Sequence, residues 1–188
     1  MQTLRSFIAI ELPDTVKSAL LSLQQELKTC GADVRWSRPE GVHLTLKFLG
    51  DIEDKLVDGI VETLKGTCGK FQKFSCEVRG VGVFPGTKAP RVLWAGIEDH
   101  GELKLIQQEI DAGMFSLGFE REGRKFSPHL TLGRFRSSEG KMALMNKMDS
   151  YKEYSVGIID VNHISFMRSD LGPSGAKYTK IAEIPFGD

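Results

Sequence analysis

The amino-acid sequence predicts an α+β protein with antiparallel sheets arranged in two lobes. The predicted strands and helices do not alternate strictly, as they would in a doubly wound parallel sheet. The tetrapeptide HLTL occurs twice, at 43–46 and 129–132, and each copy follows a predicted helix and precedes a charged one. A chain of 188 residues with 40% hydrophobic content can bury one substantial core. We therefore expect a single bilobal domain over residues 1–188, each lobe taking about half of the chain.

The first half of the chain predicts two helices separated by strands. The run RSFIAIEL is typical of a buried strand, and Pro13 after it opens a helix with one apolar stripe that ends before Gly31. Two strand-like runs then flank the turn residues RPEG, and the next segment repeats apolar residues every four positions. The expected elements are a strand at 5–12, a helix at 14–30, strands at 33–37 and 42–49, and a helix at 51–65.

The second half of the chain is richer in predicted strands. Two strands surround the Pro- and Gly-rich turn PGTKAP, and a long amphipathic segment after them predicts a third helix. The second HLTL copy forms a further strand, followed by a short helix and a closing strand pair. The expected elements are strands at 74–84 and 91–97, a helix at 101–118, a strand at 129–135, a helix at 139–150, and the pair formed by 154–169 and 176–186.

Charge and cysteine content exclude several classes of protein. The 25 basic and 25 acidic residues balance, so no global basic field holds the chain along duplex nucleic acid. The three cysteines, Cys30, Cys68 and Cys76, are odd in number and lack a CxxC pair, which argues against a disulfide framework and a zinc knuckle. The sequence has no apolar run long enough for a signal peptide or a membrane span. We therefore expect a cytoplasmic protein with no membrane partner. The sequence carries no decisive signal of an oligomer, and we expect a monomer.

The repeated tetrapeptide places a histidine and a threonine on one face of each strand. Successive side chains of a strand point to opposite faces, so residues two apart share a face. In the second copy this pairs His129 with Thr131, against an apolar face of Leu130 and Leu132. In the first copy, the same alternation predicts one face with His43, Thr45 and Lys47 and an opposite face with Leu44, Leu46 and Phe48.

Chance does not account for the repeat. Only six pairs can be formed among four histidines, and the probability that one pair shares its next three residues is roughly one in a thousand. A lone strand histidine or threonine is usually structural, and His100 and His163, which lack this context, are expected to be so. No acidic residue or further histidine follows either copy at the spacing of common metal motifs, and no GxSxG elbow or histidine-linked cysteine indicates a nucleophile.

General acid and base catalysis by two histidines remains. Near neutral pH one imidazole can take a proton from water while the other gives one to a leaving oxygen. Two threonine hydroxyls can donate to the nonbridging oxygens of a phosphate between the strands. In-line displacement at phosphorus needs the base and the acid on opposite sides, which two strands related by a pseudo-twofold axis supply.

These motifs resemble the 2H phosphoesterases. The similarity is carried by RSFIAIELP, RPEGVHLTLKFLG, GVFPGTKAPRVLWAGI and FSPHLTLGRF, and it covers nearly the whole chain. Within this family the chain is similar to the RNA 2′,3′-cyclic phosphodiesterases, also called 2′-5′ RNA ligases. The resemblance implies a bilobal α+β fold with a central cleft, and no required metal or cofactor.

The resemblance also implies roles for individual residues. His43 and His129 would be catalytic, with His129 as the base toward water and His43 as the acid toward the leaving oxygen. Thr45, Thr131 and Arg134 would bind the phosphate. The implied reaction hydrolyses a 2′,3′-cyclic phosphate at an RNA end to a 2′-phosphomonoester, and its counterpart joins RNA ends through a 2′-5′ linkage. The implied partners are such RNA ends, including tRNA halves, or cyclic nucleotides.

Less specific candidates surround these motifs. An aromatic side chain near the site can stack on a base, although each such residue is more often part of the core. The aromatic candidates are Phe7, Trp36, Phe48 and Trp94. The candidates for a local positive rim are Arg5, Arg35, Arg38, Lys47, Arg91 and Arg134. The alternative function is an RNA-end or nucleotide-binding module without physiological catalysis, against which the intact histidines of both motifs weigh.

Overall fold

A computed structural model describes residues 3–172 and 175–187 of the protein and contains two antiparallel sheets. The first sheet has the strand order β3-β1-β8-β9, and the second has the order β2-β6-β5-β4-β7. The strands of the first sheet are β1 (Thr3–Glu11), β3 (His43–Glu53), β8 (His163–Gly172) and β9 (Gly175–Pro185). Those of the second sheet are β2 (Val34–Trp36), β4 (Phe74–Phe84), β5 (Val92–Glu98), β6 (His129–Phe135) and β7 (Ser155–Val161).

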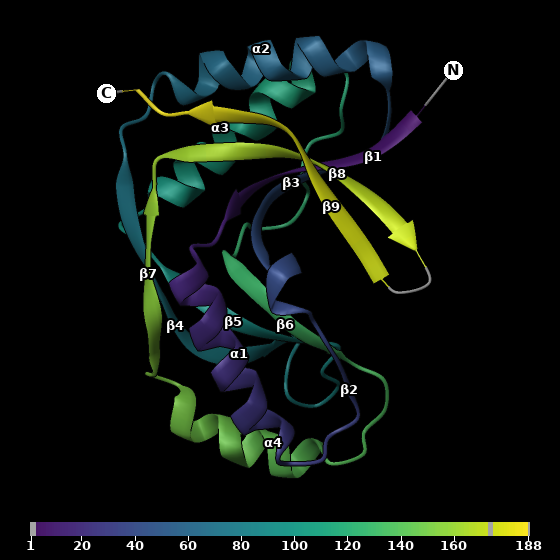
Figure 1. Ribbon diagram of the computed structural model, residues 1–188, viewed down its shortest axis with the longest axis vertical. Coiled ribbons are helices and arrows are strands. Elements are labelled where there is room, and N and C mark those ends of the chain that lie inside the picture. The colour runs from purple at the N-terminus through teal and green to yellow at the C-terminus, as the bar shows by residue number, and fades with distance from the viewer. Residues whose placement is uncertain (1–2, 173–174, 188) are drawn as a thin grey trace.

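Two helices accompany each sheet. Helices α2 and α3 lie together over the first sheet, at the top of Figure 1, whereas α1 and α4 lie with the second sheet in the lower half. The helices are α1 (Asp14–Lys28), α2 (Val57–Cys68), α3 (Glu102–Ser116) and α4 (Lys141–Met148), and short 3-10 turns occupy Pro39–Gly41, Asp54–Leu56 and Asp149–Tyr151. The α+β class and the two-lobed arrangement predicted from the sequence are confirmed.

The two lobes are interleaved along the chain. Strand β1 belongs to the first sheet and β2 to the second, and the chain then returns to the first sheet for β3. One hydrophobic cluster contains residues of both sheets, such as Leu44 of β3 and Leu132 of β6, together with Leu20 of α1 and Ile106 of α3. Burying these side chains from water is the main favourable term in folding, so the two lobes share one core.

Two predicted boundaries were wrong. The helix expected at 51–65 begins at Val57, because β3 continues to Glu53, where Ile52 pairs with Leu4 of β1. Strand pairing thus outweighs the helical periodicity there. The closing strand pair is three strands: β7 ends at Val161 in the second sheet, and β8 begins at His163 in the first sheet, on the other side of Asn162. Among the described residues no helix is both long and apolar enough to cross a membrane.

Candidate active site

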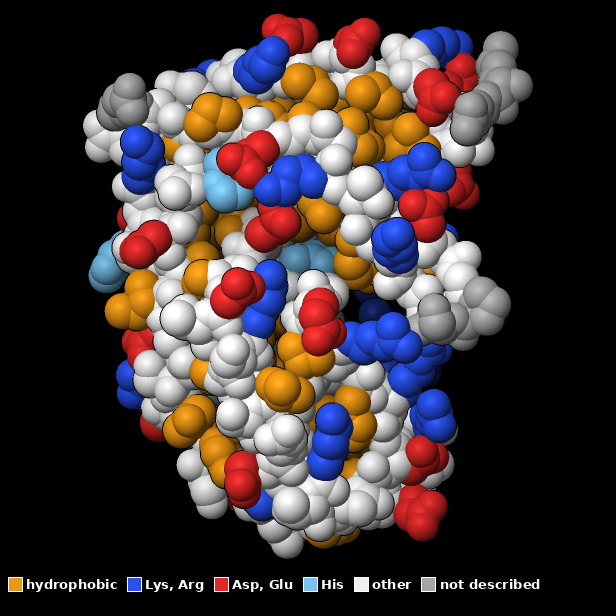
Figure 2. Space-filling view, in the orientation of Figure 1, with side chains coloured by type: hydrophobic (Ala, Val, Ile, Leu, Met, Phe, Trp, Pro, Cys, Tyr) orange, Lys and Arg blue, Asp and Glu red, His pale blue; other side chains and the backbone are white. Residues whose placement is uncertain are grey.

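Both HLTL strands line one cleft between the two sheets. Strands β3 and β6 approach each other, and the hollow beside them has a volume of about 430 Å³. Its lining includes all five residues that the sequence assigns to the site: His43, Thr45, His129, Thr131 and Arg134. Figure 2 shows this hollow on the right of the molecule, bordered by Lys and Arg side chains.

Each HLTL strand contains a β-bulge directly after its threonine. In β3, Thr45 pairs with Ala9 and Lys47 with Ile8, which leaves Leu46 as an extra residue. In β6, the residues on either side of Leu132 pair with consecutive residues of β5. An extra residue in one strand shifts the alternation of side chains by one position. The third residue after each threonine therefore returns to the cleft.

The bulges correct the faces predicted for the first copy. Lys47 does not share the face of His43 but is buried, with 5% exposure, and its ammonium lies 2.6 Å from Asp111 of α3. Phe48 does not join the apolar face; it lines the cleft and is 68% exposed. Strict alternation gave the wrong faces because the sequence carries no sign of the extra residue.

The two histidines are held in the same way. The Nδ1 atom of His43 lies 2.8 Å from the carbonyl oxygen of Gly41, and that of His129 lies 2.8 Å from the carbonyl oxygen of Ser127. A carbonyl oxygen only accepts hydrogen bonds, so Nδ1 of each ring carries the proton and donates it. Nε2 of each ring is thereby left to take or give a proton.

Aromatic rings fix both imidazoles. His43 stacks on Phe7 at 4.6 Å between ring centroids and meets the edge of Tyr178 at 5.0 Å, whereas His129 meets the edge of Phe84 at 5.0 Å. Burial lowers the pKa of His43, and the Gly41 carbonyl and the charge of Glu11 act in the opposite direction. Burial therefore favours the neutral form of His43, whereas a nearby anion favours the charged form.

The groups expected to bind phosphate have no partners in the described part of the protein. Neither the Thr45 nor the Thr131 hydroxyl makes a hydrogen bond there, and the Arg134 guanidinium has no carboxylate within 4.0 Å. No acidic side chain lies among the described residues that line the cleft. The two threonine hydroxyls and the Arg134 guanidinium thus line a hollow that would attract an anion.

The less specific candidates divide into three groups. Arg5 and Phe7 line the cleft, as does Phe48. Arg35, Trp36 and Arg38 line a second hollow that shares a wall with it. Three candidates lie outside both hollows as the structure describes them. They are Trp94, whose ring packs on Phe84, Arg91, which lines a separate pocket with Lys88 and Arg136, and the buried Lys47.

Sequence reasoning missed several residues of the site. Tyr178 of β9 touches His43, and Ser37 lines both hollows. Gly41 and Ser127 supply the carbonyl groups that orient the two histidines. Both carbonyls stand two residues before a motif histidine, so that spacing was a signal in the sequence. Nothing near Tyr178 in the sequence indicates its contact with the first motif.

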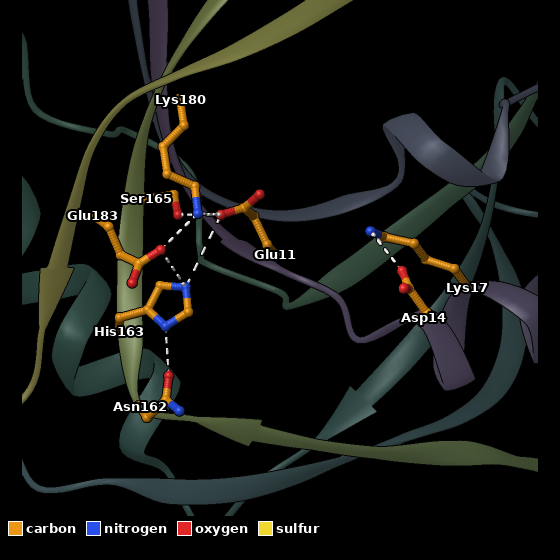
Figure 3. Close-up of polar contacts among 8 residues, drawn as sticks. All are labelled: Glu11, Asp14, Lys17, Asn162, His163, Ser165, Lys180 and Glu183. Atoms are coloured by element: carbon orange, nitrogen blue, oxygen red, sulfur yellow. Dashed lines mark hydrogen bonds and ion pairs between the residues drawn. The ribbon is translucent and has the colours of Figure 1, made fainter.

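A second polar cluster lies beside the first motif (Figure 3). Glu11 is the cross-strand partner of His43, and its carboxylate accepts a hydrogen bond from Ser165. Lys180 lies 2.6 Å from both Glu11 and Glu183. Although burial acts to raise the pKa of Glu11, the hydrogen bonds from Lys180 and Ser165 hold it below its ordinary value.

This cluster contains the one group of side chains in the described residues that has the spacing of metal ligands. Oxygen or nitrogen atoms of Glu11, His163 and Glu183 lie within 4.8 Å of one another. The ammonium group of Lys180 already stands between the two carboxylates, and a metal ion there would have to displace it. The donor set is therefore satisfied by a side chain of the protein itself.

Comparison with known proteins agrees with this geometry. The family model of LigT-like phosphoesterases matches residues 10–94 and 96–178, which include both motifs. The chain belongs to this family. The expectation of a 2H phosphoesterase, drawn from the motifs, is confirmed.

Relatives within the LigT-like phosphoesterase family span the whole chain. A protein of Methanothermobacter thermautotrophicus named RNA 2′,3′-cyclic phosphodiesterase is 32% identical over 93% of this chain and 95% of its own length. One of Thermotoga maritima with the same name is 31% identical over 97% of this chain and 96% of its own length. The crystal structure of TT0787 of Thermus thermophilus has a TM-score of 0.80 and 26% identity, covering 98% of this chain and 99% of that one.

Proposed function

We propose that the protein is an RNA 2′,3′-cyclic phosphodiesterase that hydrolyses a 2′,3′-cyclic phosphate at an RNA end to a 2′-phosphomonoester. The observation that carries the proposal is the pair of matched His–Thr strands, whose histidines face one cleft with Nδ1 bound to a carbonyl. Relatives about 30% identical over nearly the whole chain carry this name. A module that only binds RNA ends has no use for two oriented proton-transfer groups.

The reaction follows from two imidazoles on opposite sides of one phosphorus atom. A water oxygen attacks phosphorus while His129 Nε2 takes its proton, and the bond from phosphorus to the 3′ oxygen breaks as His43 Nε2 gives that oxygen a proton. The phosphate stays on the 2′ oxygen. Each histidine ends in the protonation state in which the other began, so a proton exchange with solvent restores the site.

His43 is proposed as the acid although burial lowers its pKa. Glu11 raises the pKa of His43, and a bound phosphodiester anion would raise it further. The base must be neutral and the acid protonated before the reaction begins. A negatively charged substrate therefore helps to set the protonation state of its own catalyst.

The side chains without partners bind the phosphate. The Thr45 and Thr131 hydroxyls each donate to one nonbridging oxygen, and the Arg134 guanidinium neutralises the charge that grows on those oxygens in the transition state. Phe48 offers a base an exposed aromatic face at the wall of the cleft. No step of this scheme uses a metal ion or a cofactor.

The same site can run the ligation. If the 5′ hydroxyl of a second RNA takes the place of water, the same bond to the 3′ oxygen breaks and a 2′-5′ linkage forms. We propose RNA ends such as those of tRNA halves, or small cyclic nucleotides, as substrates. We also propose that the chain acts as one bilobal unit and as a cytoplasmic monomer. Its three cysteines are free, which suits a reducing compartment.

Hydrolysis of a defined RNA with a 2′,3′-cyclic phosphate end, in the presence of a chelator, tests the proposal. We expect full activity without metal, and phosphorus NMR should show a 2′-monoester. Loss of activity that one added metal restores would refute the metal-free mechanism, and a 3′-monoester would refute the regiochemistry. If wild type and the His43→Ala/His129→Ala variant bind the RNA equally and neither cleaves it, the binding module is the better description.

A further inference from the structure

A second hollow adjoins the catalytic cleft. It has a volume of about 520 Å³, within the range of roughly 300–1,000 Å³ usual for ligand sites. Its lining and that of the cleft share six residues, which are Ser37, Gly41, Arg134, Leu171, Ala176 and Tyr178. A ligand held in the cleft can therefore extend into this hollow without leaving the protein surface.

The second hollow is cationic. Arg35, Arg38 and Arg134 line it, and no acidic side chain does so among the described residues. None of the three arginines has an ion pair or side-chain hydrogen bond within 3–172 and 175–187. Several other surface cations are paired with carboxylates, as Lys65 is with Glu62 at 2.7 Å and Lys152 with Asp149 at 2.9 Å. What distinguishes the three arginines is that they line one hollow together.

Two of these arginines stand directly opposite each other. Arg35 of β2 and Arg134 of β6 are cross-strand partners, which places their side chains on one face of the second sheet. Like charges in this position destabilise a sheet, because their repulsion is not offset by a partner. A bound anion between them would remove that repulsion, so the pair itself indicates an anionic ligand.

We propose that this hollow is a subsite for the phosphodiester that joins the terminal nucleotide of the RNA to its 5′ neighbour. This inference rests on the proposed function of the cleft. The cyclic phosphate occupies the cleft, and the RNA continues from the 5′ oxygen of the terminal ribose into the second hollow. There Arg35 and Arg38 bind the next phosphate. The substrate is then an RNA chain of at least two nucleotides, which a cyclic mononucleotide represents only in part.

The opposite side of the first motif is unsuited to this phosphate. There the carboxylates of Glu11 and Glu183 share the one ammonium of Lys180 (Figure 3). A phosphate approaching them would meet two negative charges whose compensating cation is already in use. Electrostatic attraction and repulsion therefore both favour a path of the RNA along Arg35 and Arg38 and not along the acidic cluster.

Three substrates of increasing length test the subsite. They are a 2′,3′-cyclic mononucleotide with a 5′ hydroxyl, the same compound with a 5′ phosphate, and a dinucleotide with a 2′,3′-cyclic end. For the wild type we expect kcat/KM to be about tenfold or more higher for the dinucleotide than for the mononucleotide with a 5′ hydroxyl, because arginine–phosphate hydrogen bonds are charge-assisted. The mononucleotide with a 5′ phosphate should have an intermediate value. A larger gain for the dinucleotide than for the 5′ phosphate identifies a phosphodiester subsite and not a site for any terminal phosphate.

The variant Arg35→Ala/Arg38→Ala should bring the ratio of dinucleotide to mononucleotide kcat/KM close to one. Its dependence on salt should also weaken, since each phosphate contact on a single strand adds roughly 0.7 to the slope of log K against log salt. Both arginines are at least partly exposed, so folding is not at risk. The control Lys65→Ala/Lys152→Ala makes the same change in net charge outside both hollows and should keep the wild-type ratio.

A wild-type ratio that is already near one, or a ratio that the arginine variant leaves intact, overturns the subsite. Binding of the 2′-phosphorylated dinucleotide and mononucleotide, measured by calorimetry on both proteins, gives the same test without turnover. If no cyclic substrate is hydrolysed but the dinucleotide still binds more tightly through Arg35 and Arg38, the proposed function fails and the subsite stands.

Discussion

Strands β3 and β6 carry the same four residues, HLTL, and then differ in sequence. His43 and His129 match, as do the threonines, and each strand has its bulge at the following leucine. The next residue is a buried lysine in β3 and a glycine in β6, and the one after it is Phe48 or Arg134, both of which line the cleft. The two strands thus repeat the histidine and threonine that we propose for proton transfer and phosphate binding, but they differ in the two residues that follow the bulge.

The largest effect expected concerns what the strands share. His43→Ala and His129→Ala should each lower turnover by roughly two to four orders of magnitude, the usual size of an acid or base contribution. An aryl phosphodiester has a good leaving group and needs little protonation, so it should rescue His43→Ala and not His129→Ala. Rescue of His129→Ala alone would reverse the assignment. Rescue of neither would mean that both rings mainly orient the phosphate.

The next effect concerns the residue after each bulge, Lys47 in β3 and Gly133 in β6. Lys47→Met leaves the buried Asp111 carboxylate, 7% exposed, without its closest cation and should lower the free energy of unfolding in urea by about 3–5 kcal/mol.

In the second strand, a methyl group added at Gly133 would lie 2.5 Å from Val34 Cγ1, and Gly133→Ala should lower the free energy of unfolding by about 1–3 kcal/mol. The surface control Lys65→Met should change stability by less than about 0.5 kcal/mol. Equal losses for Lys47→Met and the control would contradict a structural role for the buried pair.

The threonines test whether the two copies act equally on the phosphate. Valine keeps the shape of threonine and removes only the hydroxyl, so Thr45→Val and Thr131→Val should each lower kcat/KM by roughly 10- to 100-fold, with the strands left intact. The measurement is steady-state kinetics on one cyclic-ended RNA. If both variants turn over like the wild type, the hydroxyls do not bind the phosphate.

Phe48 and Arg134 test the difference at the cleft wall. Phe48→Ala removes an exposed ring and should raise KM roughly tenfold, as the loss of one base–aromatic stack does. The effect should depend on which base the substrate carries. Arg134→Lys keeps the charge but loses the planar guanidinium group, which can make two parallel hydrogen bonds to a phosphate. The resulting loss of activity should be the same for every base. A base-independent loss in Phe48→Ala would remove its proposed stacking role.

The smallest effect is a shift of the pH profile. Glu11→Gln removes a negative charge that raises the pKa of His43, so that pKa should fall. If His43 is the acid, the alkaline limb of kcat/KM moves to lower pH; if it is the base, the acid limb moves instead. The control is Glu183→Gln, which removes a carboxylate of the same cluster that does not act on the pKa of His43 and should leave both limbs in place. No movement of either limb would mean that Glu11 does not act on His43 in the working enzyme.

Much of the site could be predicted because its chemistry is local in sequence. A histidine and a threonine two residues apart on a strand share a face whatever the surrounding fold. The bulges could not be predicted, since Leu46 differs in no way from Leu44 as a residue type. For the same reason the prediction placed Lys47 on the cleft face and Phe48 on the buried face, the reverse of the structure. The partner of Lys47 is on α3, and only the tertiary structure brings the two together.

The fold class could be predicted, and the path of the chain could not. Hydrophobic patterns identify strands one at a time and carry no information on which sheet each strand joins. Asn162 is polar like many turn residues, yet it separates strands of two different sheets. Tyr178 reaches His43 because β9 pairs with β8 and β8 with β1, a chain of long-range contacts.

The place of β8 between β1 and β9 has a consequence for the order in which the protein is made. A chain is synthesised from its N-terminus, and segments can fold as they emerge. All strands of the second sheet are available once Val161 has been made, whereas β1 and β3 wait as a two-stranded ribbon, which is marginally stable on its own. Only β8 and β9 complete the first sheet and add Tyr178 to the side of His43. A chain that stops short of β8 therefore carries both motif histidines, His43 and His129, but lacks the Tyr178 ring that contacts the first of them.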